Sequence, residues 1–240
     1  MIFQDRTDAG RKLAERLKHL AGENPIVLAL PRGGVVAGYE VARALRAPLD
    51  VFVSRKLGAP NNPEFGFGAI AAGGVRVLDE YSVRMLGLSE EQIDRIAAAE
   101  LKELERRLRL YRGDRPMPDL RGRAVILVDD GLATGGTARA ACRAIRKMEP
   151  RRLVLAVPVS PPDTVEMMRP EVDELVCLTA PAAFMAVGQW YSDFAQTTDQ
   201  EVIELLERSR RERAERASAI TQEGGGGQPP GGQQTGRTSQ

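Results

Sequence analysis

Five short apolar runs, separated by longer amphipathic stretches, restrict the fold of this chain more than any other feature. The runs cover residues 26–30, 49–54, 124–128, 153–159 and 174–178. Runs of this length and composition are typical of strands that helices cover on both faces. Strands that alternate with helical stretches form βαβ units with right-handed crossovers. The pattern therefore predicts an α/β domain built on a doubly wound parallel sheet.

Helical periodicity fills the intervals between these runs. Helices are expected over residues 8–20, 35–46, 137–148 and 162–169, with a last helix from Thr198 to about residue 216. Ser89 and Gln92 have the spacing of a capping box, which opens a long helix over about residues 89–111. The apolar stripe of this long helix packs either on the core or on a second subunit, and the second arrangement would make a homodimer.

Glycine and proline mark the irregular parts of the chain. They are frequent in residues 56–68, which predicts a mobile loop rather than a regular element, whereas residues 75–78 predict one arm of a small hairpin. Residues 222–240 consist largely of Gly, Pro and Gln and carry almost no apolar side chain. Such a segment cannot offset the entropy of ordering, so we expect a folded domain over residues 1–221 and a flexible tail.

Composition excludes several classes of function. The chain has 34 Lys and Arg against 33 Asp and Glu, which argues against a dedicated DNA-binding protein. Two cysteines and one histidine are too few for a disulfide framework or a thiolate zinc site. No apolar run approaches the roughly 20 residues of a membrane span, and the first residues lack a secretory apolar core. We therefore expect a cytoplasmic protein that binds neither DNA nor a membrane.

Residues 125–137, VILVDDGLATGGT, join a buried strand to two carboxylates and a glycine-rich turn that enters a helix. Helix N-termini and consecutive backbone N–H groups attract phosphate. The turn supplies backbone N–H groups and hydroxyls from Ala133, Thr134, Gly135, Gly136 and Thr137. Asp129 and Asp130 would repel the same phosphate, so we assign them to sugar hydroxyls or to Mg²⁺. Phosphoribosyl pyrophosphate is the ligand that best combines these groups.

The same run resembles the phosphoribosyl pyrophosphate signature of the type I phosphoribosyltransferases and is most similar to the version in adenine phosphoribosyltransferases. LPRGGVVAGYEVARAL, residues 30–45, resembles the pyrophosphate-binding loop and helix of that family. VSRKLG, residues 53–58, is similar to the segment that enters the mobile catalytic loop of the adenine enzymes. The resemblance implies a core over about residues 26–180 and a variable hood over about residues 180–198. The long helix at 89–111 is an insertion relative to the compact family core and marks a divergent member.

The resemblance also implies roles for individual residues. Arg32, Gly33 and Gly34 would bind pyrophosphate through backbone N–H groups beside a non-proline cis peptide, and Ala133, Thr134, Gly135, Gly136 and Thr137 would hold the 5′-phosphate. Asp129 and Asp130 would bind the ribose hydroxyls directly or through Mg²⁺. Arg55 and Lys56 would neutralise the departing pyrophosphate.

Two further assignments keep an alternative beside them. Pro63-Glu64-Phe65-Gly66 resembles a stretch in which a glutamate assists the base, although Glu64 is equally compatible with a solvated loop carboxylate. Trp190 and Tyr191 lie in the candidate hood, where they would either stack on a flat base or pack in the core under the final helix.

Together these residues imply a Mg²⁺-dependent transferase of nucleotide salvage. It would move ribose 5-phosphate from phosphoribosyl pyrophosphate to a nitrogenous base and release pyrophosphate. One alternative is a sensor of phosphoribosyl pyrophosphate without turnover, which would not need Arg55, Lys56 and Glu64. Another is a ribose-phosphate hydrolase, which would share the same pocket and admit water in place of the base.

Overall fold

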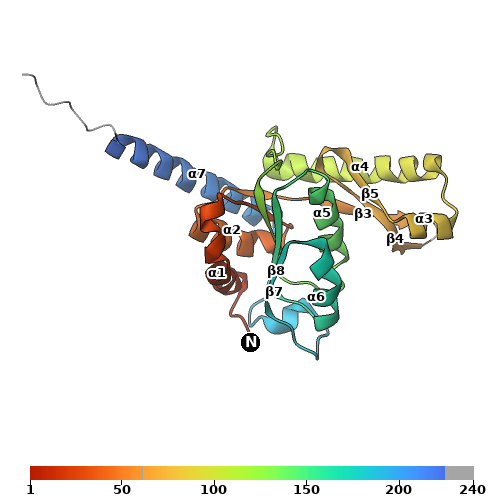
Figure 1. Ribbon diagram of the computed structural model, residues 1–240, viewed down its shortest axis with the longest axis horizontal. Coiled ribbons are helices and arrows are strands. Elements are labelled where there is room, and N and C mark those ends of the chain that lie inside the picture. Colours follow the sequence, from red (N-terminus) through yellow and green to blue (C-terminus); the bar gives the residue numbers. More distant parts are fainter. Residues whose placement is uncertain (61, 225–240) are drawn as a thin grey trace, which may run out of the picture.

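A five-stranded parallel sheet forms the centre of the computed structural model, which describes residues 1–60 and 62–224 (Figure 1). Its strands are β1 (Ile26–Ala29), β2 (Leu49–Val51), β6 (Ala124–Val128), β7 (Arg152–Val159) and β8 (Glu174–Thr179). They lie in the order β2-β1-β6-β7-β8, and each neighbouring pair is parallel. The prediction of a doubly wound parallel sheet is confirmed, and all five predicted strands are present.

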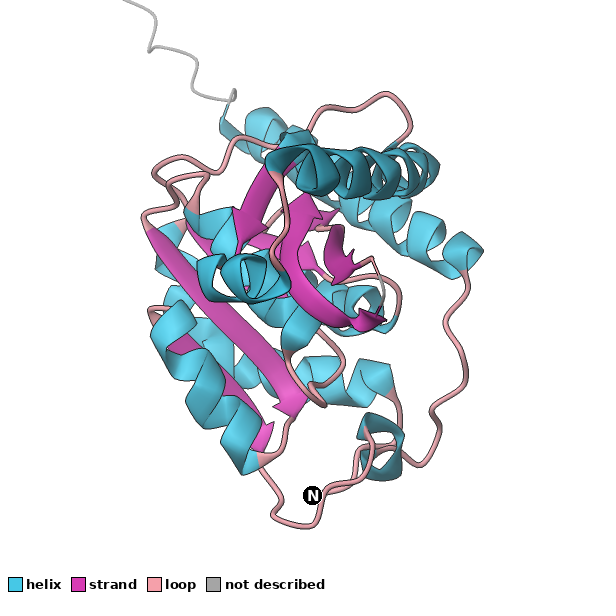
Figure 2. Ribbon diagram, turned by 90° about the vertical axis from the view of Figure 1, so that its right-hand side faces the viewer, coloured by secondary structure: helices cyan, strands magenta, loops and turns pink. Residues whose placement is uncertain are grey.

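Helices cover both faces of this sheet, as Figures 1 and 2 show. On one side lie α1 (Arg6–Leu17) and α2 (Gly33–Leu45), and on the other lie α5 (Gly136–Arg146) and α6 (Pro162–Met168). Alternate residues of a strand point to opposite faces. In β1, Val27 belongs to the core cluster with α1 and α2, whereas Leu28 belongs to the cluster with α5. This two-sided burial explains why the strand is apolar throughout.

The order of the strands places a ligand site between β1 and β6. From β1 the chain winds through α2 to β2, whereas from β6 it winds through α5 and α6 toward the opposite edge. In sheets of this kind, ligands bind beyond the carboxyl ends of the strands where the winding direction reverses. β1 ends just before Pro31, and β6 ends just before Asp129. The loops that follow these two strands therefore meet at this point.

A second sheet replaces the mobile loop that was expected over residues 56–68. β3 (Ser54–Ala59), β4 (Asn62–Ala71) and β5 (Val75–Leu78) are antiparallel, with β4 in the middle. The prediction was wrong because the glycines and prolines masked an alternating apolar pattern, in which Leu57 and Phe67 are fully buried. The expected hairpin arm at residues 75–78 is confirmed as β5.

The helix that the family resemblance implied to be an insertion, which we call the inserted helix, is α4 (Glu90–Arg112), and it packs on the core of its own chain. Its capping box is present, with the backbone N–H of Gln92 bonded to Ser89 Oγ at 3.3 Å and that of Ser89 bonded to Gln92 Oε1 at 2.9 Å. The helix lies against β3 and β4 and buries Leu104 in the main cluster. At its end, the buried Arg112 donates to Asp50 Oδ1 at 2.9 Å, which ties α4 to β2.

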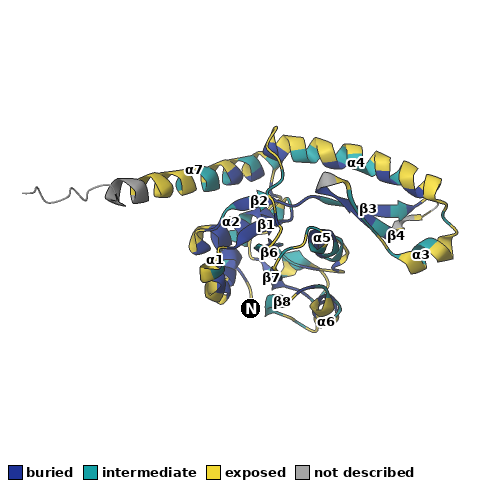
Figure 3. Cartoon of the chain, turned by 45° about the horizontal axis from the view of Figure 1, so that its top comes forward, coloured by how far each residue is buried: buried dark blue, intermediate teal, exposed yellow. Residues whose placement is uncertain are grey.

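The remaining elements complete the chain. They are α3 (Glu80–Leu86), which the sequence did not predict, α7 (Asp199–Gly224) and four short 3-10 helices at Lys18–Glu23, Ala72–Gly74, Arg169–Glu171 and Val187–Trp190. Val202 and Leu206 of α7 are buried, while its later part projects from the domain (Figures 1 and 3). The helix passes its expected end at about residue 216, so residues 222–224 are helical. The rest of the predicted tail, residues 225–240, lies outside the described residues.

No helix in residues 1–60 and 62–224 has both the length and the apolar composition needed to cross a membrane.

Candidate functional site

Two carboxylates stand at the carboxyl end of β6. The backbone N–H of Asp130 donates to Asp129 Oδ1 at 2.9 Å, which turns the chain directly after the strand. Both side chains are half-buried. Desolvation, together with the charge of Asp130, raises the pKa of Asp129 well above its usual value. A ligand that brings hydroxyl donors or a cation to this pair would stabilise the charged form of Asp129.

The loop after β1 contacts these carboxylates closely. The peptide bond between Pro31 and Arg32 is cis, as the resemblance implied. A Cβ atom on Gly33 would lie 1.9 Å from Asp130 Oδ2, so only glycine allows the loop to approach so near. Helix α2 begins at Gly33, so the backbone N–H groups of its first turn face the end of β6 and are suited to bind an anion.

The side chain of Arg32 forms an ion pair with the start of α7. Its Nη1 lies 3.9 Å from Asp199 Oδ1 at the start of α7. The same carboxylate oxygen accepts the hydroxyl of Tyr111 at 2.5 Å. Burial and this bond raise the pKa of Tyr111 to about 12. Arg32 therefore forms part of an outer wall made by the end of α4 and the start of α7.

The expected phosphate cradle lies at the start of α5. Gly135 has φ 72°, and a Cβ there would lie 2.9 Å from Thr164 Cγ2, so the turn requires glycine. Thr164 also donates its hydroxyl to the carbonyl of Ala133 at 2.7 Å, which attaches the turn to α6. The backbone N–H groups that open α5 are therefore presented as a preformed anion site.

Two cavities meet at this helix start. One, of about 660 Å³, lies between the loop after β1, strand β3 and helix α4, and its lining includes Pro31, Arg55, Lys56, Glu100 and Thr137. The other, of about 690 Å³, lies between the small sheet and α5, and its lining includes Lys56, Thr134, Gly136, Thr137 and Arg139. Both volumes are in the range of small-molecule sites. The structure thus brings Arg55 and Lys56 close to the phosphate cradle.

Arg55 has a partner that the sequence did not indicate. Its Nε lies 2.6 Å from Oε2 of Glu100, on the inserted helix. Glu64 belongs to strand β4, and its side chain lies outside the described part of the structure. Its expected catalytic role therefore stays a prediction.

The candidate hood is closed by the N-terminal segment. Tyr191 is buried, its ring centroid lies 5.4 Å from that of Phe3 and 4.9 Å from that of Phe194, and its hydroxyl donates to the carbonyl of Asp130 at 2.5 Å. Of its two expected roles, Tyr191 takes the core one, with Phe3 rather than the final helix as its cover. Trp190 is half-buried at the edge of the same cluster. Stacking of a base on Trp190 stays a prediction.

Arg6 is the site residue that sequence reasoning missed. Its Nε donates to Asp130 Oδ2 at 2.6 Å, and its Nη1 donates to the carbonyl of Ala195 at 2.7 Å. A cation in the first turn of a helix opposes the helix dipole and therefore suggests an anionic partner elsewhere. That signal was missed because the helix was expected to begin at residue 8, whereas α1 begins at Arg6. The separation of 124 positions between Arg6 and Asp130 also kept the partner hidden.

The donor set suits Mg²⁺ in part. Asp129 and Asp130 offer carboxylate oxygens, the ligands that Mg²⁺ prefers. Among the described residues, no group of three or more His, Cys, Asp or Glu side chains is arranged to hold a metal. Mg²⁺ often binds through one or two carboxylates together with oxygens of a phosphorylated substrate. The pair therefore fits a cation that arrives with its ligand.

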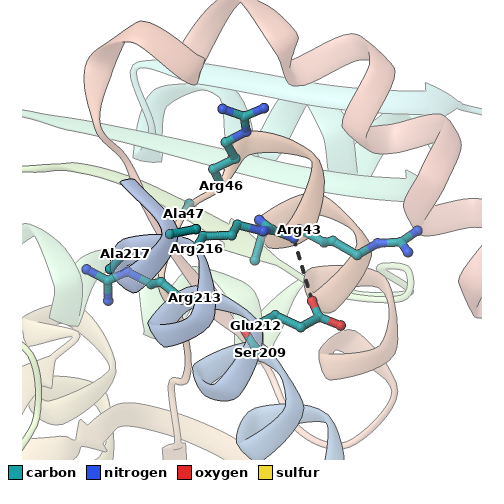
Figure 4. Close-up of a pocket in the computed structure, with 10 residues that line it drawn as sticks. Arg43, Arg46, Ala47, Ser209, Glu212, Arg213, Arg216 and Ala217 are labelled. Atoms are coloured by element: carbon teal, nitrogen blue, oxygen red, sulfur yellow. Dashed lines mark ion pairs between the residues drawn. The ribbon is translucent and has the colours of Figure 1, made fainter. Parts of the chain in front are cut away.

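A separate cavity between α2 and α7 lies away from these groups (Figure 4). It has a volume of about 620 Å³, and Arg43, Arg46, Arg213 and Arg216 surround its alanine-lined floor. Glu212 pairs with Arg216 at 3.8 Å. Arg43 and Arg46 lie at the C-terminal end of α2, whereas the loop that meets the acidic pair precedes its N-terminus. We therefore place the candidate site at the carboxyl ends of β1 and β6.

Known proteins are similar to this chain in both sequence and fold. A family model described as a phosphoribosyl transferase domain matches residues 3–192. Two Mycobacterium tuberculosis proteins, provisionally named phosphoribosyl transferases MT0597 and Rv0571c, are 50% identical over 219 residues, or 91% of this chain. The chain spans about half (49%) of the length of these relatives. The crystal structure of TT1426 from Thermus thermophilus is 46% identical, with a TM-score of 0.80, and the match covers 86% of this chain and 98% of that one.

Proposed function

The chain belongs to the phosphoribosyl transferase domain family, and on this premise we propose that it transfers ribose 5-phosphate from phosphoribosyl pyrophosphate to a nitrogenous base. The observation that carries the proposal is the approach of Gly33 to Asp130 beside the N-terminus of α5. The N-termini of α2 and α5, each able to bind an anion through backbone N–H groups, are thus both close in the fold to the carboxylate pair. This supports a sugar that bears pyrophosphate at one end and phosphate at the other as the ligand.

In the proposed reaction, the bond between the anomeric carbon and the pyrophosphate oxygen breaks, and a bond from that carbon to the acceptor nitrogen forms. The electron pair leaves with pyrophosphate, and the acceptor nitrogen loses its proton. Positive charge grows on the sugar while negative charge grows on the leaving group. Such a reaction needs positioning and charge stabilisation rather than a covalent nucleophile.

Each group of site residues would serve one part of the proposed reaction. The N-terminus of α5 would hold the 5′-phosphate, and the first turn of α2 would bind pyrophosphate through backbone N–H groups. Arg55 and Lys56, in the wall of the adjacent cavity, would neutralise the charge that develops on the leaving group. Asp129 and Asp130 would bind the ribose hydroxyls and Mg²⁺. The cation supplies charge neutralisation for the pyrophosphate when it is bound.

A screen of nitrogenous bases by pyrophosphate release tests the proposal. The purified chain is mixed with phosphoribosyl pyrophosphate, Mg²⁺ and one base at a time. We expect at least one base to raise the release of pyrophosphate well above the rate without base, with formation of the matching nucleotide. A control without any base separates transfer from hydrolysis, because a ribose-phosphate hydrolase would release pyrophosphate equally in both samples.

Binding without turnover for every base would contradict a transferase and would favour a sensor. Absence of binding would contradict the assignment of the ligand itself. Calorimetry with phosphoribosyl pyrophosphate and Mg²⁺, run before the screen, distinguishes these two results.

A further inference from the structure

Arg6 lies at a position of helix α1 where the helix itself does not favour a cation. It is the first residue of that helix, where a positive side chain opposes the helix dipole and is unfavourable. Its side chain is 11% exposed, whereas that of Arg11 on the same helix is 64% exposed. A buried cation also loses hydration, which only good partners offset. The contacts of Arg6 outside its own helix must therefore account for its position.

Those contacts use both edges and one face of the guanidinium. Nε donates to Asp130 Oδ2 at 2.6 Å, Nη1 donates to the carbonyl of Ala195 at 2.7 Å, and Cζ lies 3.8 Å from the ring centroid of Phe194. Arginine can make all three contacts at once because its charged group is planar and forked. A lysine could keep only the charge. The set therefore anchors one cation between the end of β6 and the hood.

The N-terminal segment and the hood are joined beside this cation. The backbone N–H of Phe3 donates to the carbonyl of Trp190 at 2.8 Å, and that of Ser192 donates to the carbonyl of Phe3 at 2.8 Å. Tyr191 in turn donates its hydroxyl to the carbonyl of Asp130 at 2.5 Å. Arg6, the hood and the acidic pair thus form one connected unit, so a change at Arg6 is felt at Asp130.

We propose that Arg6 is a positioning residue for phosphoribosyl pyrophosphate, which holds Asp130 in the orientation that binds the ribose hydroxyls. This inference rests on the proposed function. A carboxylate has about four lone-pair positions, so Asp130 can accept from Arg6 at Oδ2 and from a hydroxyl as well. Arg6 acts on the ligand through Asp130 and through the closeness of the hood, without touching the reacting atoms.

The opposite role, a plug that the ligand displaces, would use the same ion pair. The contacts of the guanidinium with Ala195 and Phe194 argue against it, because these groups hold Arg6 independently of Asp130. Displacement would break all three contacts at once. The two roles predict opposite effects, since removing a plug tightens binding and removing a positioning residue weakens it.

Calorimetry with phosphoribosyl pyrophosphate and Mg²⁺ on the full chain tests the proposal. Arg6→Gln removes the charge, and we expect the affinity to fall at least tenfold. Arg6→Lys keeps the cation without the fork, and we expect it to recover part of that loss. Arg11→Gln is the matched control on the same helix, and we expect it to leave the affinity unchanged. An unchanged or tighter affinity in Arg6→Gln overturns the proposal.

A double-mutant cycle separates positioning from a general structural role. In the Asp130→Asn background, we expect Arg6→Gln to cost less than threefold, because the side chain that Arg6 orients has lost its charge. Equal losses in both backgrounds would show that Arg6 acts independently of Asp130. If Arg6→Gln does not fold, Arg6→Lys carries the same cycle. Failure of the wild-type chain to bind overturns the proposed function instead, so the two failures are distinguishable.

Discussion

Arg55 and Glu100 form an ion pair, 2.6 Å from Nε to Oε2, which joins the first strand of the small sheet to the inserted helix α4. Both residues line the cavity of about 660 Å³ that also reaches Thr137, at the start of α5. Helix α4 thus contributes an acidic group beside the place proposed for pyrophosphate. Glu100 and an incoming anion would compete for the same guanidinium.

This competition predicts that Glu100→Gln strengthens the binding of pyrophosphate. Partly exposed pairs of this kind contribute about 0.2–1 kcal/mol, so we expect a gain in affinity of about 1.4- to fivefold. Calorimetry with pyrophosphate and Mg²⁺ measures it. Glu91→Gln is the control, because Glu91 lies on the same helix and pairs with Arg95, and neither residue lines the cavity. Weaker binding in Glu100→Gln would mean that Glu100 holds Arg55 in its productive position.

The acidic pair gives the most direct test of the ligand. Replacing Asp129 and Asp130 together by Asn removes both charges while keeping similar shapes. We expect the affinity for phosphoribosyl pyrophosphate with Mg²⁺ to fall at least tenfold in calorimetry, because charge-assisted hydrogen bonds are about twice as strong as neutral ones. Asp163→Asn, at an exposed position in α6, serves as the control. Equal affinities in the double variant and the wild type would contradict the assignment of the pair.

The raised pKa of Asp129 predicts that the charge of this side chain destabilises the folded chain at neutral pH. The folded chain holds the Asp129 proton more tightly than the unfolded chain, because desolvation and Asp130 disfavour the charged form. The free energy of unfolding therefore falls as pH rises above the ordinary value of 3.8 toward the folded pKa. Asp129→Asn lacks this proton and keeps an oxygen for the N–H of Asp130. We expect its melting temperature to exceed that of the wild type at pH 7.

Thermal unfolding at several pH values checks this difference. It should shrink as the pH is lowered toward 4, because the wild-type carboxyl is then neutral as well. A difference that stays constant with pH would show that the charge of Asp129 is not its cause.

The strands and the glycine-rich turn before α5 could be predicted because their causes are local. β1 and β6 are buried on both faces, so every residue of each is apolar, and the turn before Gly136 carries its own glycines. Contacts between segments that are distant in the sequence could not be predicted, because their causes are not local. The pairing of Arg6 with Asp130 and that of Arg55 with Glu100 depend on how distant elements pack.

The small sheet shows how one signal can mask another. Glycine and proline between residues 56 and 68 indicated a loop, yet Leu57 and Phe67 are buried in the core cluster that includes α4. Burial of these side chains outweighs the weak strand propensity of the glycines, because propensity in strands depends on context. A Cβ on Gly68 would lie 2.4 Å from the carbonyl oxygen of Val77, so one glycine of this stretch serves the close contact between strands.

Deletion of residues 225–240 is expected to change little. The segment is rich in Gly, Pro and Gln and carries no large apolar side chain, so it offers little surface to bury. We expect the melting temperature to stay within about 1 °C and the turnover to stay unchanged after truncation behind Gly224. A loss of several degrees would show that the tail docks on the domain.

Lys56 and Glu64 separate an enzyme from a sensor. Lys56 lines both cavities at the start of α5, and Glu64 lies on the adjacent strand β4. If Lys56 stabilises the charge that grows on pyrophosphate only as it leaves, its loss lowers turnover and spares ground-state binding. We expect Lys56→Ala to reduce turnover about 100-fold and to change the affinity for phosphoribosyl pyrophosphate only about threefold.

Single-turnover kinetics on the wild type, Lys56→Ala and Glu64→Gln measure the two effects separately. Glu64→Gln should follow Lys56→Ala if the glutamate assists the acceptor base, and should equal the wild type if it is a solvated carboxylate. Lys102→Ala, on the inserted helix, is the control for loss of a positive charge. A sensor has no chemical step, so in a sensor Lys56 can affect the affinity alone. Equal losses of binding and rate in Lys56→Ala would therefore place this side chain in ligand binding rather than in the chemical step. A wild-type chain that shows no turnover with any base would mean that Lys56 on β3 and Glu64 on β4 have no part in a chemical step.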